Sequence, residues 1–185
     1  DLIEILNTSA LRLNDFAQSS LIITDLRTVP ENFKTQAINL RDIMVKIIGK
    51  QKIALDEKKI RYNFNCSIVN PTMVGNENLI KTCITHLLKN AINYSPEGQT
   101  ITILCTEKEG SLMVSFEDNG PGFSENALKT LFKPFSHGEE HIDKNKGLGL
   151  MLVKMIIDFH HARILVSNKS DHGARVELIF DRTDP

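Results

Sequence analysis

The chain has 185 residues, of which 41% are hydrophobic and 24% are charged, so it can bury the core of one globular domain. Its 22 Lys and Arg residues are balanced by 23 Asp and Glu residues, and the formal charge of −1 argues against nucleic acid or an anionic membrane as a partner. No apolar run reaches the roughly 18 residues that a membrane span requires, so we expect no membrane contact by this segment, even if the parent protein is anchored. Cys66, Cys83 and Cys105 lie far apart among apolar neighbours, which is typical of reduced thiols in a cytoplasmic protein.

The first 27 residues contain neither Gly nor Pro and predict one long helix, which Val29 and Pro30 end. Its apolar positions recur at spacings of four and three, the heptad pattern of a helix that packs on partner helices; this seam comprises Leu2, Leu6, Ser9, Leu13, Phe16, Ser20 and Ile23. We expect residues 1–30 to be appended to a domain of residues 31–185, with homodimerisation through residues 1–28. The alternative is a helix packed into the core of its own domain.

The rest of the chain alternates short strands and amphipathic helices. We expect a strand at 33–38, a helix at 40–59 capped by Asn39, a strand at 60–67, a helix at 77–94, a hairpin of 100–107 and 111–118, a polar irregular segment to Lys146, a helix at 147–161, and strands at 163–168 and 174–181. This order is typical of an α+β two-layer sandwich, in which a mixed sheet packs on helices.

A glycine-rich stretch, "EDNGPGF" at residues 117–123, follows the second strand of the hairpin. The strand's alternation delivers Asp118 to its end, and Gly120 and Gly122 allow the backbone to come close to whatever lies above. Taken alone, the stretch predicts only a turn, because Asp, Asn and Gly are common turn residues.

Polar side chains share one face of the helix at 77–94, namely His86, Asn90 and Asn93. The amide oxygen of Asn90 can complete a Mg²⁺ shell whose other ligands are phosphates and water. A solvated polar face is the alternative.

A second glycine cluster, "NKGLGLMLVK", places Gly147 and Gly149 at a helix start, where free N–H groups attract phosphate. A glycine hinge is the alternative. About 24 residues separate the two glycine clusters, which is long for an idle connection and indicates a lid, with Phe132 of "LFKPF" as one of two aromatic anchors.

In this order, the Asn-bearing helix, the DxGxG strand end, the F-x-P-F segment and GLGL resemble the N box, first glycine box, F box and second glycine box of the sensor histidine kinase catalytic domain. That domain shares its Bergerat ATP-binding fold with the ATPase part of DNA gyrase and with the mismatch-repair ATPases. The resemblance covers roughly residues 33–185, and the first helix resembles the second helix of the dimerisation and histidine-phosphotransfer hairpin. It implies ATP and Mg²⁺ as ligands and a response regulator receiver domain as a partner.

The resemblance also implies roles for individual residues. Asp118 would accept a hydrogen bond from the adenine amino group, Asn90 would hold Mg²⁺, and Tyr94 would lie along the nucleotide. Gly147, Leu148 and Gly149 would present main-chain donors to the phosphates. The implied nucleotide-binding set is Asn90, Asn93, Tyr94, Asp118, Gly120, Gly122, Phe132, Asn145, Lys146, Gly147, Leu148 and Gly149.

The chain departs from the family pattern at two positions of this set. Asn93 stands where the family commonly has a phosphate-binding cation, and Asn145 stands where the second glycine box usually begins with glycine. Lys144 and Lys146 flank Asn145 and could supply the missing charge to the γ-phosphate as catalytic residues, although lysines in a polar loop are also often only solvated.

His86 is the remaining catalytic candidate. It occupies the position at which ATP-hydrolysing relatives carry a glutamate base, and the absence of a carboxylate there favours transfer over hydrolysis. None of the six histidines has the setting of a phosphoacceptor, so we expect the acceptor upstream of residue 1 or on another chain. The sequence thus predicts a protein-histidine kinase; the alternatives are an ATP-hydrolysing member of the superfamily and a nucleotide-binding pseudokinase that serves as a dimeric scaffold.

Overall fold

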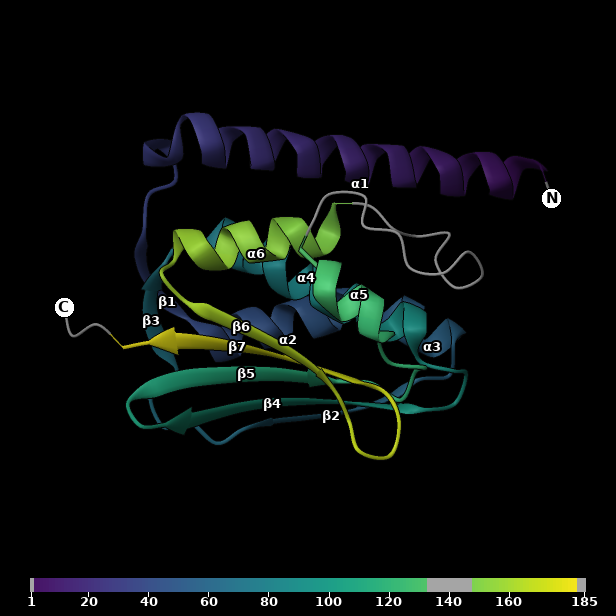
Figure 1. Cartoon of the computed structure of the whole chain (residues 1–185). Helices are drawn as coiled ribbons and strands as arrows, with labels where there is room; N and C mark the ends of the chain where they lie inside the picture. Colours follow the sequence, from purple (N-terminus) through teal and green to yellow (C-terminus); the bar gives the residue numbers. More distant parts are fainter. Residues whose placement is uncertain (1, 133–147, 183–185) are drawn as a thin grey trace.

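The structure is a computed structural model that describes residues 2–132 and 148–182 (Figure 1). The helices are α1 (Leu2–Thr28), the short 3-10 helix η1 (Pro30–Asn32), α2 (Leu40–Lys50), α3 (Lys52–Glu57), α4 (Glu77–Tyr94), α5 (Glu125–Thr130) and α6 (Gly149–Phe159). The strands are β1 (Gln36–Asn39), β2 (Arg61–Cys66), β3 (Thr72–Gly75), β4 (Thr100–Lys108), β5 (Ser111–Glu117), β6 (Arg163–Asn168) and β7 (Ala174–Asp181).

The main sheet has five strands in the order β2-β4-β5-β7-β6. β2 pairs with β4 in parallel and the other neighbours are antiparallel, so the sheet is mixed, as the sequence predicts. β1 and β3 form a separate antiparallel pair. Helices α2, α4 and α6 cover one face of the main sheet, which confirms the two-layer α+β architecture (Figure 1).

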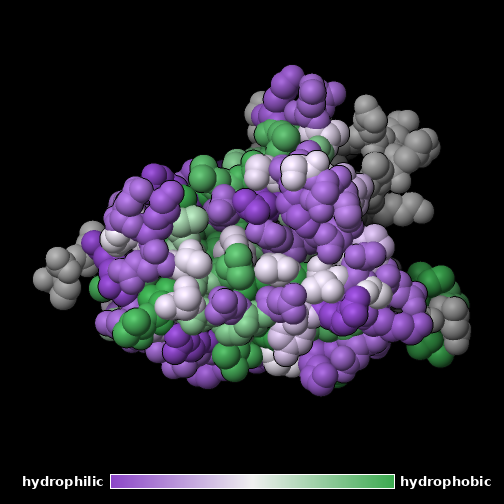
Figure 2. Space-filling view, turned by 90° about the horizontal axis from the view of Figure 1, so that it is seen from below, coloured by the Kyte–Doolittle hydropathy of each residue, from purple (hydrophilic) through white to green (hydrophobic). Residues whose placement is uncertain are grey.

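Alternation along the strands separates the two faces of the sheet. Cys105, Val114 and Leu178 form one row across β4, β5 and β7 and are completely buried under the helices. The neighbouring row points outward and is mixed in character, for example Leu104 beside Ser115 and Glu177. Figure 2 views the molecule from this outer side, where hydrophobic and hydrophilic residues are interspersed.

Helix α1 lies across the helix layer on the side away from the sheet (Figure 1). Its second half packs against the domain, where Ser19, Ile23 and Leu26 are buried. Its first half leaves its large apolar side chains exposed; these include Leu2, Ile3, Ile5, Leu6, Leu11 and Leu13. Among the described residues, the end of the heptad seam is therefore buried, while its early positions Leu2, Leu6 and Leu13 are exposed. No helix in the described residues is both long enough and apolar enough to cross a membrane.

Three local features differ from the sequence expectation. The helix expected at 40–59 is two helices that meet at Gln51, whose φ of −90° and ψ of 3° are not helical, and α3 buries Leu55. β3 was not expected. The polar segment after residue 123 contains α5, which Ser124 caps by accepting a hydrogen bond from the N–H of Ala127 at 3.1 Å.

A histidine joins the end of α6 to the start of α4. His160 Nε2 accepts a hydrogen bond from the Asn76 N–H at 2.9 Å, and Nδ1 lies 2.7 Å from the Ile156 carbonyl oxygen, to which it can donate. Only a neutral imidazole can make both bonds. Asn76 in turn caps α4 through the Leu79 N–H at 3.0 Å, so the joint supports the Asn-bearing helix.

This joint predicts a pH dependence of stability. Burial is the main factor that lowers the pKa of His160 below its ordinary value, so the unfolded chain takes up a proton more readily than the folded chain. As pH falls below about 6.5, the free energy of unfolding should decrease, by at most about 1.4 kcal/mol per pH unit from this group. Urea unfolding measures this effect: the free energy of unfolding should differ less between pH 8 and pH 5.5 in His160→Gln than in the native chain. The control is His161→Asn at the exposed neighbour, which should keep the native difference between the two pH values. If His160→Gln also keeps the native difference, His160 is not the source of the pH dependence.

Candidate functional site

The end of β5 holds a carboxylate in a fixed orientation. Asp118 Oδ1 accepts hydrogen bonds from the N–H groups of Gly120 at 2.9 Å and Ala174 at 3.1 Å, and the Asp118 N–H donates to the Ala174 carbonyl at 3.0 Å. Oδ2 has no hydrogen-bond partner among the described residues. One oxygen is therefore anchored to the main chain, and the other is an available acceptor for a ligand.

Glycines line the loop that carries this carboxylate. A Cβ on Gly120 would lie 2.6 Å from the Tyr94 carbonyl oxygen, and a Cβ on Gly122, where φ is +74°, would lie 2.7 Å from Asn168 Oδ1. A Cβ on Gly173, where φ is +95°, would overlap the main-chain oxygen of Asp118. The loop thus fits between the end of α4 and the β6–β7 turn only without side chains at these positions.

Helix α4 contributes the second wall. The side chains of Asn90 and Tyr94, one turn apart, are half-buried, and the Asn90 amide makes no hydrogen bond to any described residue. A free amide oxygen suits a hard cation such as Mg²⁺, so the donor present here fits the metal that the sequence implies. Burial raises the pKa of the Tyr94 phenol above its ordinary value, which keeps it neutral. Asn93 is exposed, and its main-chain oxygen accepts a hydrogen bond from Lys58 Nζ at 2.6 Å.

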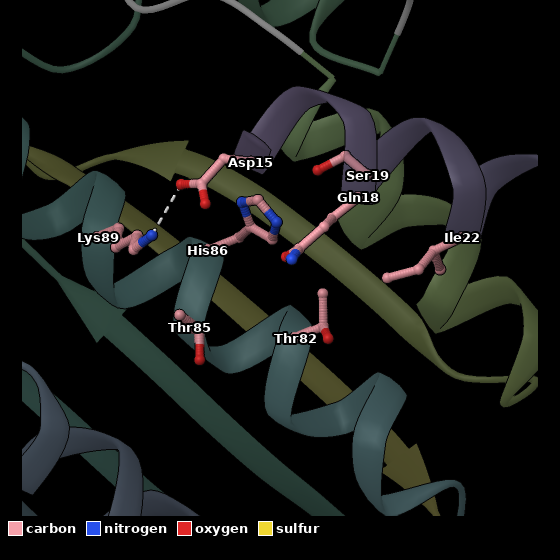
Figure 3. Close-up of a pocket in the computed structure, with 8 residues that line it drawn as sticks. All are labelled: Asp15, Gln18, Ser19, Ile22, Thr82, Thr85, His86 and Lys89. Carbon is pink, nitrogen blue, oxygen red and sulfur yellow. Dashed lines mark hydrogen bonds and ion pairs between the residues drawn. The ribbon is translucent and has the colours of Figure 1, made fainter. Parts of the chain in front are cut away.

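His86 lies on α4 one helical turn before Asn90. It lines a cavity of about 150 Å³ between α4 and α1, together with Asp15, Gln18, Ser19, Ile22, Thr82, Thr85 and Lys89 (Figure 3). Burial is the largest cause that lowers the pKa of His86, and the Lys89 charge adds to it while Asp15 opposes it. A Cβ on Gly149 would lie 3.4 Å from His86 Nδ1, so this neutral imidazole also backs the start of α6.

Lys89 and Asp15 close one end of this cavity. Their Nζ and Oδ2 atoms are 2.9 Å apart and connect α4 to α1 (Figure 3). Both side chains are about half exposed, so the pair contributes at most about 1 kcal/mol.

The second glycine cluster is described only in part. Leu148 occupies the N-cap position of α6, Gly149 begins the helix, and no described side chain caps its first N–H groups. Phe132, just after α5, is half-buried. Lys144, Asn145, Lys146 and Gly147 lie outside the described residues, so the expected charge compensation stays a prediction.

The structure adds residues that the sequence did not single out. Gly173, Asn168 and Lys169 all come from the end of β6 and the β6–β7 turn and contact the loop at 118–123. The turn residues Asp171, His172 and Gly173 were a visible signal for a tight connection. Nothing local marked Asn168 or Lys169, because their partners lie 45 to 51 residues earlier.

Comparisons with known proteins agree with this geometry. The model of the family described as histidine kinase-, DNA gyrase B-, and HSP90-like ATPase matches residues 75–184. The chain is 24% identical over 171 residues to the heme sensor protein HssS of Staphylococcus saprophyticus, covering 92% of this chain but 36% of that protein. The chain thus spans about a third of the length of this relative.

Solved structures share the fold. The histidine kinase AdeS of Acinetobacter baumannii superposes with a TM-score of 0.80 at 20% identity, over 99% of this chain and 84% of that chain. The histidine kinase ThkA, solved in complex with the response regulator protein TrrA, gives a TM-score of 0.71 at 20% identity, over 92% of this chain and 49% of that chain. The family match covers more than half of the sequence and includes the Asn-bearing helix, both glycine clusters and the closing strands. The chain therefore belongs to the family of histidine kinase-, DNA gyrase B-, and HSP90-like ATPases.

Proposed function

We propose that the chain is the catalytic part of a protein-histidine kinase of two-component signalling. It binds Mg²⁺-ATP and transfers the γ-phosphoryl group to a histidine outside this sequence. The observation that carries the proposal is the Asp118 carboxylate, whose Oδ1 is held by Gly120 and Ala174 while Oδ2 is available. An acceptor fixed in this way beside a glycine loop suits the amino group of adenine.

The other residues of the site support a nucleotide in the same place. Gly120 and Gly122 let the backbone pass close to the base, and Tyr94 adjoins Gly120. The amide oxygen of Asn90 is the proposed protein ligand for Mg²⁺, which supplies charge neutralisation on the phosphates when it is bound. Main-chain donors at Leu148 and Gly149 serve the phosphates, and we propose that Gly147, Asn145, Lys144 and Lys146 complete this set.

His86 supports transfer rather than hydrolysis. The ATP-hydrolysing branch needs a base to activate water, and here the corresponding side chain is an imidazole that faces α1 in a cavity (Figure 3). With no carboxylate at this position, phosphoryl transfer depends on positioning and on charge neutralisation, which is what this reaction chiefly requires of a protein.

Helix α1 is the proposed contact to partners. We assign residues 1–30 to the dimerisation and phosphotransfer hairpin and residues 31–185 to the catalytic domain, with a response regulator as the recipient of the phosphate. The exposed first half of α1 supports this assignment. The free thiols Cys83 and Cys105, both buried, are consistent with a cytoplasmic location for this segment.

The kinase proposal is tested by following the γ-phosphate. We expect the chain, given Mg²⁺-ATP labelled on the γ-phosphate and a separately made acceptor hairpin, to place acid-labile label on a histidine of the acceptor. The chain incubated alone should carry no label on any of its six histidines. Release of inorganic phosphate with an unlabelled acceptor would favour the hydrolysing alternative. Nucleotide binding with neither product would leave the scaffold alternative.

The exposed half of α1 predicts self-association. Leu6 and Leu13 are 60% and 69% exposed, and burying each against a partner helix would contribute roughly 1.5–3 kcal/mol. The native chain should dimerise in sedimentation experiments, and the double variant Leu6→Asp/Leu13→Asp should be monomeric. Leu165→Asp, at an exposed residue of the outer sheet face, should dimerise like the native chain. A native chain that stays monomeric at high concentration would contradict the hairpin assignment.

A further inference from the structure

Asn168, the last residue of β6, is hydrogen-bonded to the main chain of the glycine loop at residues 118–123. Asn168 Oδ1 accepts a hydrogen bond from the Phe123 N–H at 2.7 Å, and Asn168 Nδ2 donates to the Phe123 carbonyl at 2.8 Å. Both main-chain polar groups of Phe123 are thus satisfied by a single side chain, as a neighbouring strand would do. A Cβ on Gly122 would lie only 2.7 Å from the same Oδ1, so these two hydrogen bonds require glycine at position 122.

The next residue holds the other end of the loop. Lys169 Nζ donates to the Asp118 carbonyl at 3.2 Å and to Asn119 Oδ1 at 2.8 Å. Asn119 Nδ2 donates to the Thr100 carbonyl at 2.8 Å, which connects this end to the start of β4. The Asn119 side chain is therefore hydrogen-bonded on both sides, to Lys169 and to the start of β4, and Lys169 also binds the Asp118 carbonyl.

Between these two anchors the loop is held by the hydrogen bond from the Gly120 N–H to Asp118 Oδ1. It contains Gly120 and Gly122, and glycine has more backbone freedom than any other residue. If the ligand must order the loop when it binds, the conformational free energy of ordering the loop is subtracted from the binding free energy. Because both ends are anchored before the ligand binds, the loop is already ordered and Asp118 Oδ2 is held in a fixed orientation.

We propose that Asn168 and Lys169 are positioning residues for the adenine site, which hold residues 118–123 in their nucleotide-binding conformation before the ligand binds. They act through Asp118 and need not touch the nucleotide. The inference rests on the proposed function, because it assumes that the base is bound at Asp118.

The test is a double-substitution cycle read by calorimetric titration with Mg²⁺-ADP. We expect Asn168→Ala to weaken binding about tenfold, because the freed loop must be ordered by the ligand. Asn168→Asp keeps the acceptor for the Phe123 N–H and loses the donor, so it should recover part of the affinity. Lys169→Met should weaken binding in the same direction. Asn65→Ala, at an exposed asparagine on the outer side of β2, should bind like the native chain.

The cycle separates positioning from a general loss of stability. In an Asp118→Asn background the carboxylate is gone, so Asn168→Ala should change ADP affinity by less than about twofold. A positioning role also predicts that Asn168→Ala reduces the preference for ADP over inosine diphosphate. If Asn168→Ala lowers affinity equally in both backgrounds and leaves the preference unchanged, the role is structural only and the inference is wrong. If Asn168→Ala does not fold, Asn168→Asp and Lys169→Met carry the same cycle. A native chain that binds no ADP would instead overturn the proposed function.

Discussion

Asn90→Ala should lose phosphoryl transfer to an acceptor histidine by a factor of about one hundred or more, equivalent to about 2.7 kcal/mol. The amide oxygen of Asn90 makes no hydrogen bond to a described residue, and we propose it as the protein's ligand for Mg²⁺. Its removal should therefore weaken ATP binding strongly with Mg²⁺ present and only slightly in EDTA. Titrations under both conditions, together with the transfer rate, measure the effect.

A matched control comes from the other end of the same helix. Asn78 is an exposed asparagine in the first turn of α4, and Asn78→Ala should bind and transfer like the native chain. Equal losses for Asn90→Ala with Mg²⁺ and in EDTA would show that Asn90 is not a metal ligand.

Gly173→Ala, in the β6–β7 turn, should destabilise the fold more than the same change at Gly110 in the β4–β5 turn. At φ of +95° any other residue is strained, and the added Cβ would overlap the main-chain oxygen of Asp118. Together these effects should cost roughly 3–5 kcal/mol, which lowers the melting temperature of a chain of this size by about 6–20 °C. Nucleotide binding should be lost as well, because the displaced group carries the carboxylate of the site.

Gly110→Ala isolates the backbone-strain part of this effect. Gly110 has φ of +79° but nothing lies within 4 Å of an added Cβ, so the change brings backbone strain without overlap. It should cost about 1–2 kcal/mol and leave ADP binding intact. Similar melting temperatures for the two variants would mean that the contact between Gly173 and Asp118 does not constrain the site.

The elements that the sequence predicted well are those with strong local signals. Helix α4 runs from Glu77 to Tyr94 as expected, because Asn76 caps its start and Ser95 and Pro96 end it. The closing strands β6 and β7 also have the expected bounds, since each alternates or is rich in β-branched residues between clear turn residues.

Elements whose signal is not local were missed. β3 has four residues and is defined by its pairing with β1, more than 30 positions earlier, so no periodicity within it could be read. The break at Gln51 carries no local signal such as Pro, although after it α3 buries Leu55. The helix α1 itself was predicted correctly, but the heptad pattern could not show that Ser19, Ile23 and Leu26 pack on the chain's own domain while the earlier positions stay exposed.

The candidate site likewise contains residues with a local sequence signal and residues without one. Asp118, Gly120 and Gly122 stand out as a motif within five residues, and the structure brings Gly120 beside Tyr94. Asn168 and Lys169 contact that motif from a different strand, so only the folded chain reveals them. The proposed roles at 133–147 fall outside the described residues and rest on the sequence alone.

The placement of adenine at Asp118 is tested by comparing the affinities for ADP and for inosine diphosphate, whose base carries a carbonyl in place of the amino group. The native chain should prefer ADP by roughly ten- to a hundredfold, as expected for a hydrogen bond to a charged group. Asp118→Asn can keep the two bonds from Gly120 and Ala174 at its amide oxygen while it presents an N–H where Oδ2 stood. It should therefore melt near the native temperature, lose most of its ADP affinity and bind inosine diphosphate as well as ADP or better. Equal affinity of the native chain for both nucleotides, or an unchanged preference in Asp118→Asn, would contradict the placement of adenine at Asp118.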